Sequence, residues 1–262
     1  MKRQPPAVSL FRTSQAIKAR GVEVELHQHE EAQLMYASSG TLQIHTRSGC
    51  WLVPPQLAVW VPAHVLHKID VLSDVHVCIV YYQAIAARTW APAQALNRTF
   101  ALGVTPLLRE LIFAAVKPDN SSEKSELLVK LILNELNDIT DAPTFLPLPS
   151  SPVGKRVADL AIRYQEIQMD VAELARQAGT SVRNISRVFP AETGLTFKSW
   201  RQRARIVLSI EQLSGKVPVA RVAAKVGFSS TAAFSYAFRQ IIGMTPSEFM
   251  ERNALIKNPQ KQ

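Results

Sequence analysis

Glycine, cysteine and long apolar runs are scarce in this chain of 262 residues. Ten glycines exclude collagen-like and glycine-linker architectures. The two cysteines, Cys50 and Cys78, form no CxxC pair, so we expect two buried thiols. No apolar stretch reaches the roughly 18–20 residues of a bilayer span, and the N-terminus shows no apolar signal segment. We therefore expect a cytoplasmic protein with no membrane partner.

Acidic residues are scarce only in the C-terminal part. Residues 1–152 hold 13 Lys and Arg against 13 Asp and Glu, whereas residues 153–262 hold 17 against 8. Between the two parts, residues 143–152 contain four prolines, which break both helix and strand and predict a linker. All six histidines lie before this linker. The basic part predicts a polyanion partner, although charge alone does not separate DNA, RNA and a membrane surface.

The basic part contains an internal repeat. Residues 171–179 read VAELARQAG, and residues 219–227 read VARVAAKVG. A second apolar segment follows each copy, at 185–189 and 234–238. Each unit therefore predicts a short helix, a glycine turn and a second helix, which is the helix-turn-helix pattern.

The residues of the repeat suit this pattern physically. Ala175 and Ala223 are small enough for two helices to cross closely. Gly179 and Gly227 tolerate the positive φ that the turn requires, and a serine after each glycine can cap the next helix. The alternative is a helical hairpin that only builds a core. Two copies in a basic part favour DNA binding.

A long amphipathic helix is predicted between the two units, over residues 197–214, with Thr196 as its N-cap. It would hold two recognition helices about one DNA turn apart, roughly 34 Å, so that they enter successive major grooves. Residues 245–248 read TPSE, which predicts the start of a last helix with a capping box.

The span 153–251 resembles the DNA-binding domain of AraC-family transcription regulators. The residues that carry the resemblance most specifically are Val222–Phe228, Phe234, Phe238, Arg239 and Gly243–Phe249. The resemblance implies seven helices, two helix-turn-helix units and transcriptional control. The partners that we expect are a double-stranded DNA operator, a small-molecule effector and a second copy in a homodimer, with RNA polymerase as a further candidate.

The exposed face of each predicted recognition helix gives the DNA contacts. Arg183 and Arg187 lie four residues apart and share a face, and arginine can bind guanine O6 and N7 with two hydrogen bonds. Ala232 and Ala233 replace polar residues that are usual in the family, so we expect the first unit to carry most of the base readout. The alternative for the two arginines is phosphate contact or solvated charge. The expected base-reading residues are Arg183, Asn184, Ser186, Arg187, Thr231, Ala232, Ala233 and Tyr236. The expected phosphate-binding residues are Ser181, Ser230, Arg239, Arg201 and Arg205, with Thr231 as an additional candidate.

Residues 22–83 alternate apolar and polar side chains in short runs, which predicts an antiparallel β-barrel. Residues 20–85 resemble the two motifs of the cupin barrel. His27, His29 and His67 match the metal-binding histidines of that family, while Gln33 stands where a glutamate is expected and Ala63 replaces a turn glycine.

A shared strand face lets His27 and His29 point into the barrel together. Two or three imidazoles suit Zn, Ni, Fe or Cu, but a neutral Gln33 is a poorer ligand than a carboxylate. We therefore expect no cofactor, with a divalent metal at His27, His29 and His67 as the alternative. The histidines would otherwise be neutral parts of the pocket wall, in direct contact with a ligand or not. The expected effector pocket comprises His27, His29, Gln33, Tyr36, Trp60 and His67.

Two helical stretches, 104–117 and 123–139, precede the linker. The second has more apolar surface than one intramolecular face needs, and in related regulators this region mediates dimerisation. The alternative is simple packing on the barrel.

These observations predict a two-domain α+β protein that is not an enzyme. Residues 1–142 form a cupin-like, antiparallel β-barrel with helices for ligand sensing and dimerisation, 143–152 a Pro-rich linker, and 153–262 an all-α DNA-binding domain with two helix-turn-helix units. The expected function is small-molecule control of operator binding, with an adjacent transporter gene as a candidate target. The alternatives are a metal-dependent cupin enzyme fused to a DNA-binding domain, and an architectural DNA binder.

Overall fold

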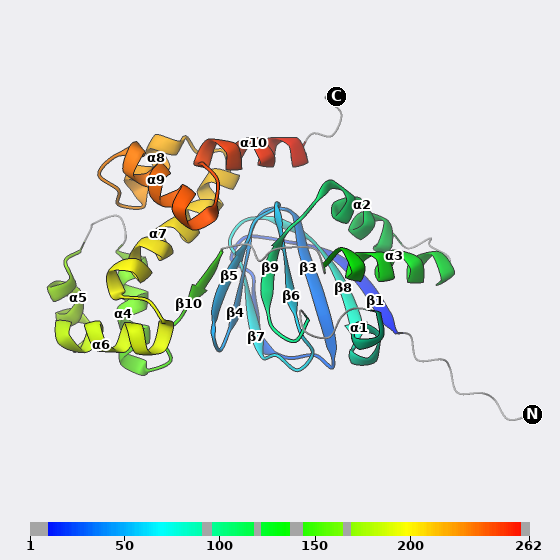
Figure 1. Ribbon diagram of the computed structural model, residues 1–262, viewed down its shortest axis with the longest axis horizontal. Helices are drawn as coiled ribbons and strands as arrows, with labels where there is room; N and C mark the ends of the chain where they lie inside the picture. The colour runs from blue at the N-terminus through cyan, green and yellow to red at the C-terminus, as the bar shows by residue number, and fades with distance from the viewer. Residues whose placement is uncertain (1–9, 91–95, 118–121, 137–143, 165–168, 258–262) are drawn as a thin grey trace, which may run out of the picture.

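Alternating side chains in the N-terminal part and helical periodicity in the C-terminal part produce a sheet domain and a helical domain (Figure 1). The computed structural model describes residues 10–90, 96–117, 122–136, 144–164 and 169–257. The strands are β1 (Phe11–Lys18), β2 (Glu23–His27), β3 (Glu31–Ser39), β4 (Leu42–Thr46), β5 (Gly49–Val53), β6 (Leu57–Val61), β7 (His67–Val71), β8 (Val75–Gln83), β9 (Phe100–Gly103) and β10 (Phe145–Pro147). The helices of the sheet domain are α1 (Ala84–Trp90), α2 (Pro106–Ala115) and α3 (Ser122–Glu135). The helices of the helical domain are α4 (Pro152–Arg163), α5 (Val171–Gln177), α6 (Val182–Thr193), α7 (Phe197–Ser214), α8 (Val219–Lys225), α9 (Thr231–Ile242) and α10 (Pro246–Lys257).

The strands form two five-stranded antiparallel sheets in the orders β1-β8-β3-β6-β9 and β10-β5-β4-β7-β2. The predicted fold class is confirmed, with a jelly-roll-like pair of facing sheets as the form of the barrel. Met35 and Ala37 point between the sheets into a buried apolar core. Leu34 and Tyr36 alternate with them and point to the other face of β3.

Helices α2 and α3 cover that other face, as Figure 1 shows. Tyr82 on β8 donates its hydroxyl to the carbonyl of Val129 on α3, at 3.1 Å. Val129, Ile132 and Leu133 are buried against the sheet. One face of α3 is therefore used by packing within the chain.

The proline-rich segment 143–152 is predicted to be a linker without helix or strand, but the structure places a strand and a helix start in it. Residues 145–147 form β10, which pairs with β5 in antiparallel register. Pro147 is tolerated because β10 is an edge strand, where a missing N–H costs no ladder bond on the outer side. The last residue of the predicted linker, Pro152, is the first residue of α4. Residue 143, the first residue of the predicted linker, lies outside the described residues.

Seven helices, α4–α10, build the helical domain within the described part of the chain, as the resemblance implied. The N-terminal half of α7 contributes Trp200 to one apolar cluster, with α4, α5 and α6. Its C-terminal half contributes Ile210 to a second cluster, with α8, α9 and α10. Helix α7 thus contributes to the hydrophobic cores of both halves of the domain and connects them.

The same helix contacts the sheet domain. Cys50 of β5 belongs to the first helical cluster, and Leu52 of β5 belongs to the second. Trp200 donates its indole N–H to the carbonyl of Pro147 at 2.6 Å, and Arg203 Nε donates to the carbonyl of Phe145 at 2.7 Å. The two domains are therefore joined through β5, β10 and α7.

Both cysteines are free and buried, as predicted. Burial raises the pKa of the Cys50 and Cys78 thiols to about 11. Within the described part of the chain, no helix combines the length and the hydropathy that crossing a membrane requires.

Candidate functional site

The two repeated units fold as helix-turn-helix pairs with matching turns. Gly179 and Gly227 both have positive φ, at 64° and 77°. In each turn the residue after the glycine donates its amide to the carbonyl of the crossing alanine: Thr180 to Ala175, and Phe228 to Ala223, both at 2.9 Å. The repeat seen in the sequence is therefore also a repeat of backbone hydrogen bonds.

The serines cap the second helix of each unit. Ser181 Oγ accepts from the amide of Asn184 at 3.2 Å, and Ser230 Oγ accepts from the amide of Ala233 at 3.1 Å. Of the two serines considered for the second unit, Ser230 is the one that caps. Both serines are exposed at a helix N-terminus, where free amides favour an anion.

The predicted base-reading residues of the first unit lie on the outer face of α6. Arg183, Ser186 and Arg187 are exposed, while Ile185 and Phe189 point into the core. Arg187 Nη2 donates to Asn184 Oδ1 at 3.0 Å. Asn184 in turn donates to Thr180 Oγ1 at 2.9 Å. The Arg187 guanidinium is thus oriented by side chains of its own helix and turn.

The outer face of α9 has a different character. Tyr236 is 69% exposed, and Thr231, Ala232, Ala233 and Arg239 are exposed beside it. This face offers the methyl groups of two alanines near its N-terminal end, then one phenol, and a cation in its last turn. Alanine can contact only a thymine methyl group or let the backbone approach.

A groove of about 660 Å³ runs between the two units. Ser186 of α6, Phe228 of the second turn, and Arg201 and Arg205 of α7 line it. Among described residues, Arg201 Nε and Nη2 and Arg205 Nε are buried without a hydrogen-bond partner. Burial lowers the pKa of both guanidinium groups. Arg201 and Arg205 thus place positive charge in the groove beside α6, where Asp170 also lines it.

The three predicted histidines meet at one end of the sandwich. The nitrogen atoms of His27, His29 and His67 lie within 4.8 Å of one another. His27 and His67 each place Nδ1 against a backbone carbonyl, of Glu25 at 2.6 Å and of Val65 at 2.8 Å. Nδ1 is therefore the protonated nitrogen, and Nε2 carries the lone pair.

Gln33 completes this cluster. Its Nε2 lies 3.0 Å from His67 Nε2, so the amide donates to the imidazole lone pair. Burial, together with the neighbouring His27 and Arg12, lowers the pKa of His29 against the effect of Glu31, which raises it. Burial also lowers the pKa of His67 against the effect of the Val65 carbonyl, which raises it. Both rings are neutral near pH 7, which is the form that binds a metal.

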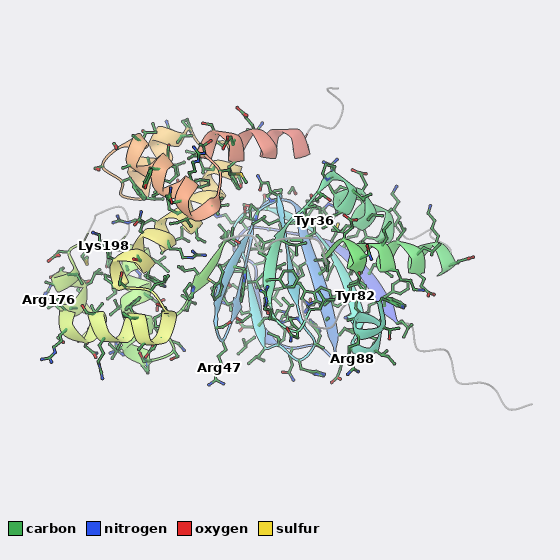
Figure 2. The ribbon with its side chains drawn as sticks, in the orientation of Figure 1. Tyr36, Arg47, Tyr82, Arg88, Arg176 and Lys198 are labelled. Carbon is green, nitrogen blue, oxygen red and sulfur yellow. The ribbon has the colours of Figure 1, made fainter. Side chains whose placement is uncertain are left out.

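Tyr36 and Trp60 do not belong to this cluster, so the prediction of one pocket that includes them is wrong. Trp60 lies opposite Leu34 in the β3–β6 register, on the face that α2 and α3 cover. Figure 2 shows Tyr36 on the side of the sheet domain that carries these helices. Both side chains are fully buried core, and burial raises the pKa of Tyr36 to about 12. The physical reason is parity: Gln33 and Tyr36 are three residues apart on one strand and face opposite sides.

Sequence reasoning missed the residues that join the domains. Arg203 stands between Arg201 and Arg205 in the sequence, but it faces β10 and not the groove between the helix-turn-helix units. The helical period carries the signal, since residues two apart lie on roughly opposite faces.

Comparison with known proteins agrees with this arrangement. Residues 15–136 match the AraC-like ligand binding domain, and residues 174–252 match a helix-turn-helix domain. The HTH-type transcriptional regulator NimR of Escherichia coli is 27% identical over 230 residues, which cover 87% of this chain and 82% of NimR. The arabinose operon regulatory protein of Escherichia coli is 28% identical over 124 residues, 47% of this chain and 42% of that protein. The crystal structure of ToxT from Vibrio cholerae aligns with 92% of this chain and 97% of its own, at 13% identity and a TM-score of 0.40.

Proposed function

Because this chain belongs to the AraC family of transcription regulators, we propose that α6 reads bases in an operator and that α9 mainly positions the protein on the backbone. The observation that carries this proposal is the pair of exposed arginines, Arg183 and Arg187, on a capped and repeated recognition helix. The exposed face of α9 has alanines at the corresponding places. Guanine readout by α6 and methyl or phosphate contacts by α9 follow from these side chains.

The groove between the two units supports a phosphate role for α7. When both recognition helices lie in major grooves of one duplex, the DNA backbone must pass between them. Arg201 and Arg205 line this groove with buried donor atoms that have no partner among the described residues. A phosphate would satisfy these donors and release counterions from the DNA. We assign Ser181, Ser230, Thr231 and Arg239, which are exposed at the ends of α6 and α9, to further phosphate contacts.

Selection of bound fragments from random DNA tests the operator proposal with the full chain. We expect a site with two motifs one helical turn apart for each subunit, the first more sharply defined than the second. A selection that enriches no sequence, at a salt concentration where non-specific binding is weak, would contradict it.

We also propose that the chain dimerises through the outer face of α3. Leu127 is 62% and Leu131 is 43% exposed, one turn apart, and Leu107 on α2 is 52% exposed. An unpaired apolar stripe of this kind suits a second copy of the same helix. The double variant Leu127→Lys/Leu131→Lys should be monomeric by sedimentation, whereas Arg88→Ala on α1 should not change the oligomeric state. A wild-type chain that is monomeric at 50 μM overturns this part.

The histidine cluster is the second candidate site in the sheet domain. Three imidazoles, each with a ring nitrogen within 4.8 Å of those of the other two, fit a divalent transition metal. The Nδ1 contacts of His27 and His67 to backbone carbonyls orient these two rings as metal-binding histidines are commonly oriented. The ion would have to replace the hydrogen bond from Gln33 to His67. We propose His27, His29 and His67 as its ligands, with Gln33 as the neighbour that adds no charge.

Metal analysis separates this site from a plain hydrogen-bonded cluster. Purified protein incubated with Zn²⁺ or Ni²⁺ and desalted should retain about one ion per chain, and His27→Ala should retain none. Equal retention by both proteins would place the ion elsewhere, and no retention would leave the histidines as pocket wall only.

We propose that the chain regulates transcription without catalysing a reaction, since its relatives are named as regulators. Contact with RNA polymerase, control of an adjacent transporter gene and a cytoplasmic location stay predictions from the sequence. Operator binding that changes when an effector is added, without any conversion of that effector, would also separate this function from the enzyme and architectural alternatives.

A further inference from the structure

Three side chains of the first helix-turn-helix unit, Thr180, Asn184 and Arg187, form a chain of hydrogen bonds. Asn184 Nδ2 donates to Thr180 Oγ1 at 2.9 Å, and Arg187 Nη2 donates to Asn184 Oδ1 at 3.0 Å. The chain begins in the turn between α5 and α6 (Figure 1) and ends at the exposed Arg187 guanidinium. It therefore connects the turn of the unit to a side chain that is proposed to read a base.

The turn gives this chain of bonds a fixed starting point. Thr180 is half-buried, and its backbone amide donates to the carbonyl of Ala175 at 2.9 Å. The next residue, Ser181, caps α6 by accepting from the amide of Asn184 at 3.2 Å. The backbone is thus bonded on both sides of the Thr180 side chain, so its hydroxyl presents Asn184 with an acceptor in a defined place.

Both polar atoms of the Asn184 amide are engaged within the protein. Reading adenine takes the oxygen and the nitrogen of one amide together on the same base edge. The Asn184 amide instead directs its nitrogen back to the turn and its oxygen forward to Arg187. A guanidinium only donates hydrogen bonds, so it must face the amide oxygen, which fixes this orientation. The geometry suits positioning of Arg187 better than contact with a base.

Arg187 keeps the donors that guanine needs. A guanidinium has five N–H groups, and the bond to Asn184 uses one hydrogen of Nη2. Whichever of the two Nη2 hydrogens is used, one edge of the guanidinium keeps two adjacent donors for guanine O6 and N7. A free arginine side chain loses much rotamer freedom when it binds, and one that Asn184 already holds loses less.

The second helix-turn-helix unit cannot form the same chain of bonds. Ala233 stands at the place of Asn184, and Tyr236 stands at the place of Arg187. An alanine side chain offers neither donor nor acceptor. The hydrogen-bond chain therefore belongs to the unit whose recognition helix carries the exposed arginines.

We infer that Thr180 and Asn184 are positioning residues, which set base specificity through Arg187 without contacting a base themselves. The inference rests on the proposed function, in which α6 reads guanine, and it replaces base reading as the role of Asn184. Holding the guanidinium before DNA arrives favours the base that fits the held geometry over the other bases.

Fluorescence anisotropy with the full chain tests this inference, with the selected site and its single base-pair substitutions at one salt concentration. Thr180→Val removes the hydroxyl and keeps the shape of the side chain. It should reduce the preference for guanine at the base pair that Arg187 contacts by about two- to tenfold. Preferences at the other base pairs and the affinity for non-specific DNA should not change. Thr180→Ser keeps the hydroxyl and should restore wild-type preference, and Thr13→Val on β1 is the matched control.

Asn184→Ala separates positioning from reading, and it keeps the test valid if Thr180→Val fails to fold. It should weaken the preference at the Arg187 base pair only, and it should have no further effect in an Arg187→Ala background. Loss of preference at a second base pair would make Asn184 a base reader and overturn the inference. An unchanged preference in both variants, or a loss of affinity that is equal for all sequences, would overturn it as well.

The inference and the proposed function fail in different ways. If Arg187→Ala abolishes discrimination at its base pair while Thr180→Val and Asn184→Ala preserve it, the proposed function survives and the inference is wrong. If Arg187→Ala itself leaves discrimination intact, base reading by Arg187 is wrong and the inference is overturned with it.

Discussion

Arg187→Ala is the substitution that most sharply separates base reading from general attraction to DNA. The Arg187 guanidinium is exposed and is oriented by Asn184, which is itself held by Thr180. A bidentate arginine–guanine pair contributes about 1–3 kcal/mol of discrimination. At about 1.4 kcal/mol for each factor of ten, this predicts a loss of roughly 5- to 150-fold in affinity for the selected site.

Fluorescence anisotropy at one fixed salt concentration gives the measurement, with the selected site and a set of its single base-pair substitutions. The variant should lose affinity for the selected site and become indifferent to the base pair that Arg187 contacts. Arg88→Ala removes the same charge from α1, which Figure 2 shows on the sheet domain, and should bind like the wild-type protein. A uniform loss of affinity across all sequences, with discrimination intact, refutes base reading by Arg187 and leaves a phosphate contact.

Three further predictions concern charge and stability. Arg205→Gln should reduce the slope of log K against log salt by about 1 and leave the sequence preference unchanged; an unchanged slope removes Arg205 from the phosphate contacts. Phe238→Ala removes a fully buried ring beside Phe234 and should lower the free energy of unfolding by about 3–5 kcal/mol in urea titrations, whereas a loss below 1 kcal/mol contradicts the packing. Burial alone would raise the pKa of Glu192, but hydrogen bonds from Ser150 and Ser151 outweigh it and lower the pKa. Glu192→Gln should therefore cost about 1 kcal/mol at pH 7 after allowance for solvent screening, and this difference should shrink as the pH falls through the lowered pKa of Glu192, where the wild-type carboxylate takes up a proton; a difference that stays constant across the acidic range contradicts the assignment.

Much of the DNA-binding domain could be predicted because its signals are local. The glycine turn, the capping serine and the i, i+4 apolar pairs all act within about ten residues, and the sequence repeats them. Ser181, Ser230 and the core positions Ile185 and Phe189 take the places that local rules assign to them.

The sheet domain was harder because its site depends on pairing between distant strands. The sequence predicts that His27 and His29 share a strand face, but β2 ends at His27 and His29 lies in the loop that follows it. The three histidines nevertheless come together, whereas the assignment of Tyr36 and Trp60 to the same pocket conflicts with strand parity. Strand β10 was missed because proline normally breaks strands, and only its place at a sheet edge makes Pro147 acceptable. The contact of Arg203 with the Phe145 carbonyl joins residues from distant segments, so no local pattern reveals it.

Interference footprinting on the selected site tests the central claim, that two repeated helix-turn-helix units bind one face of duplex DNA. Phosphate ethylation should block binding in two clusters on one face of the helix, about one turn or roughly 10 base pairs apart, and guanine N7 methylation should block it chiefly in the cluster that α6 contacts. A single cluster, or two clusters on opposite faces of the duplex, would contradict the account.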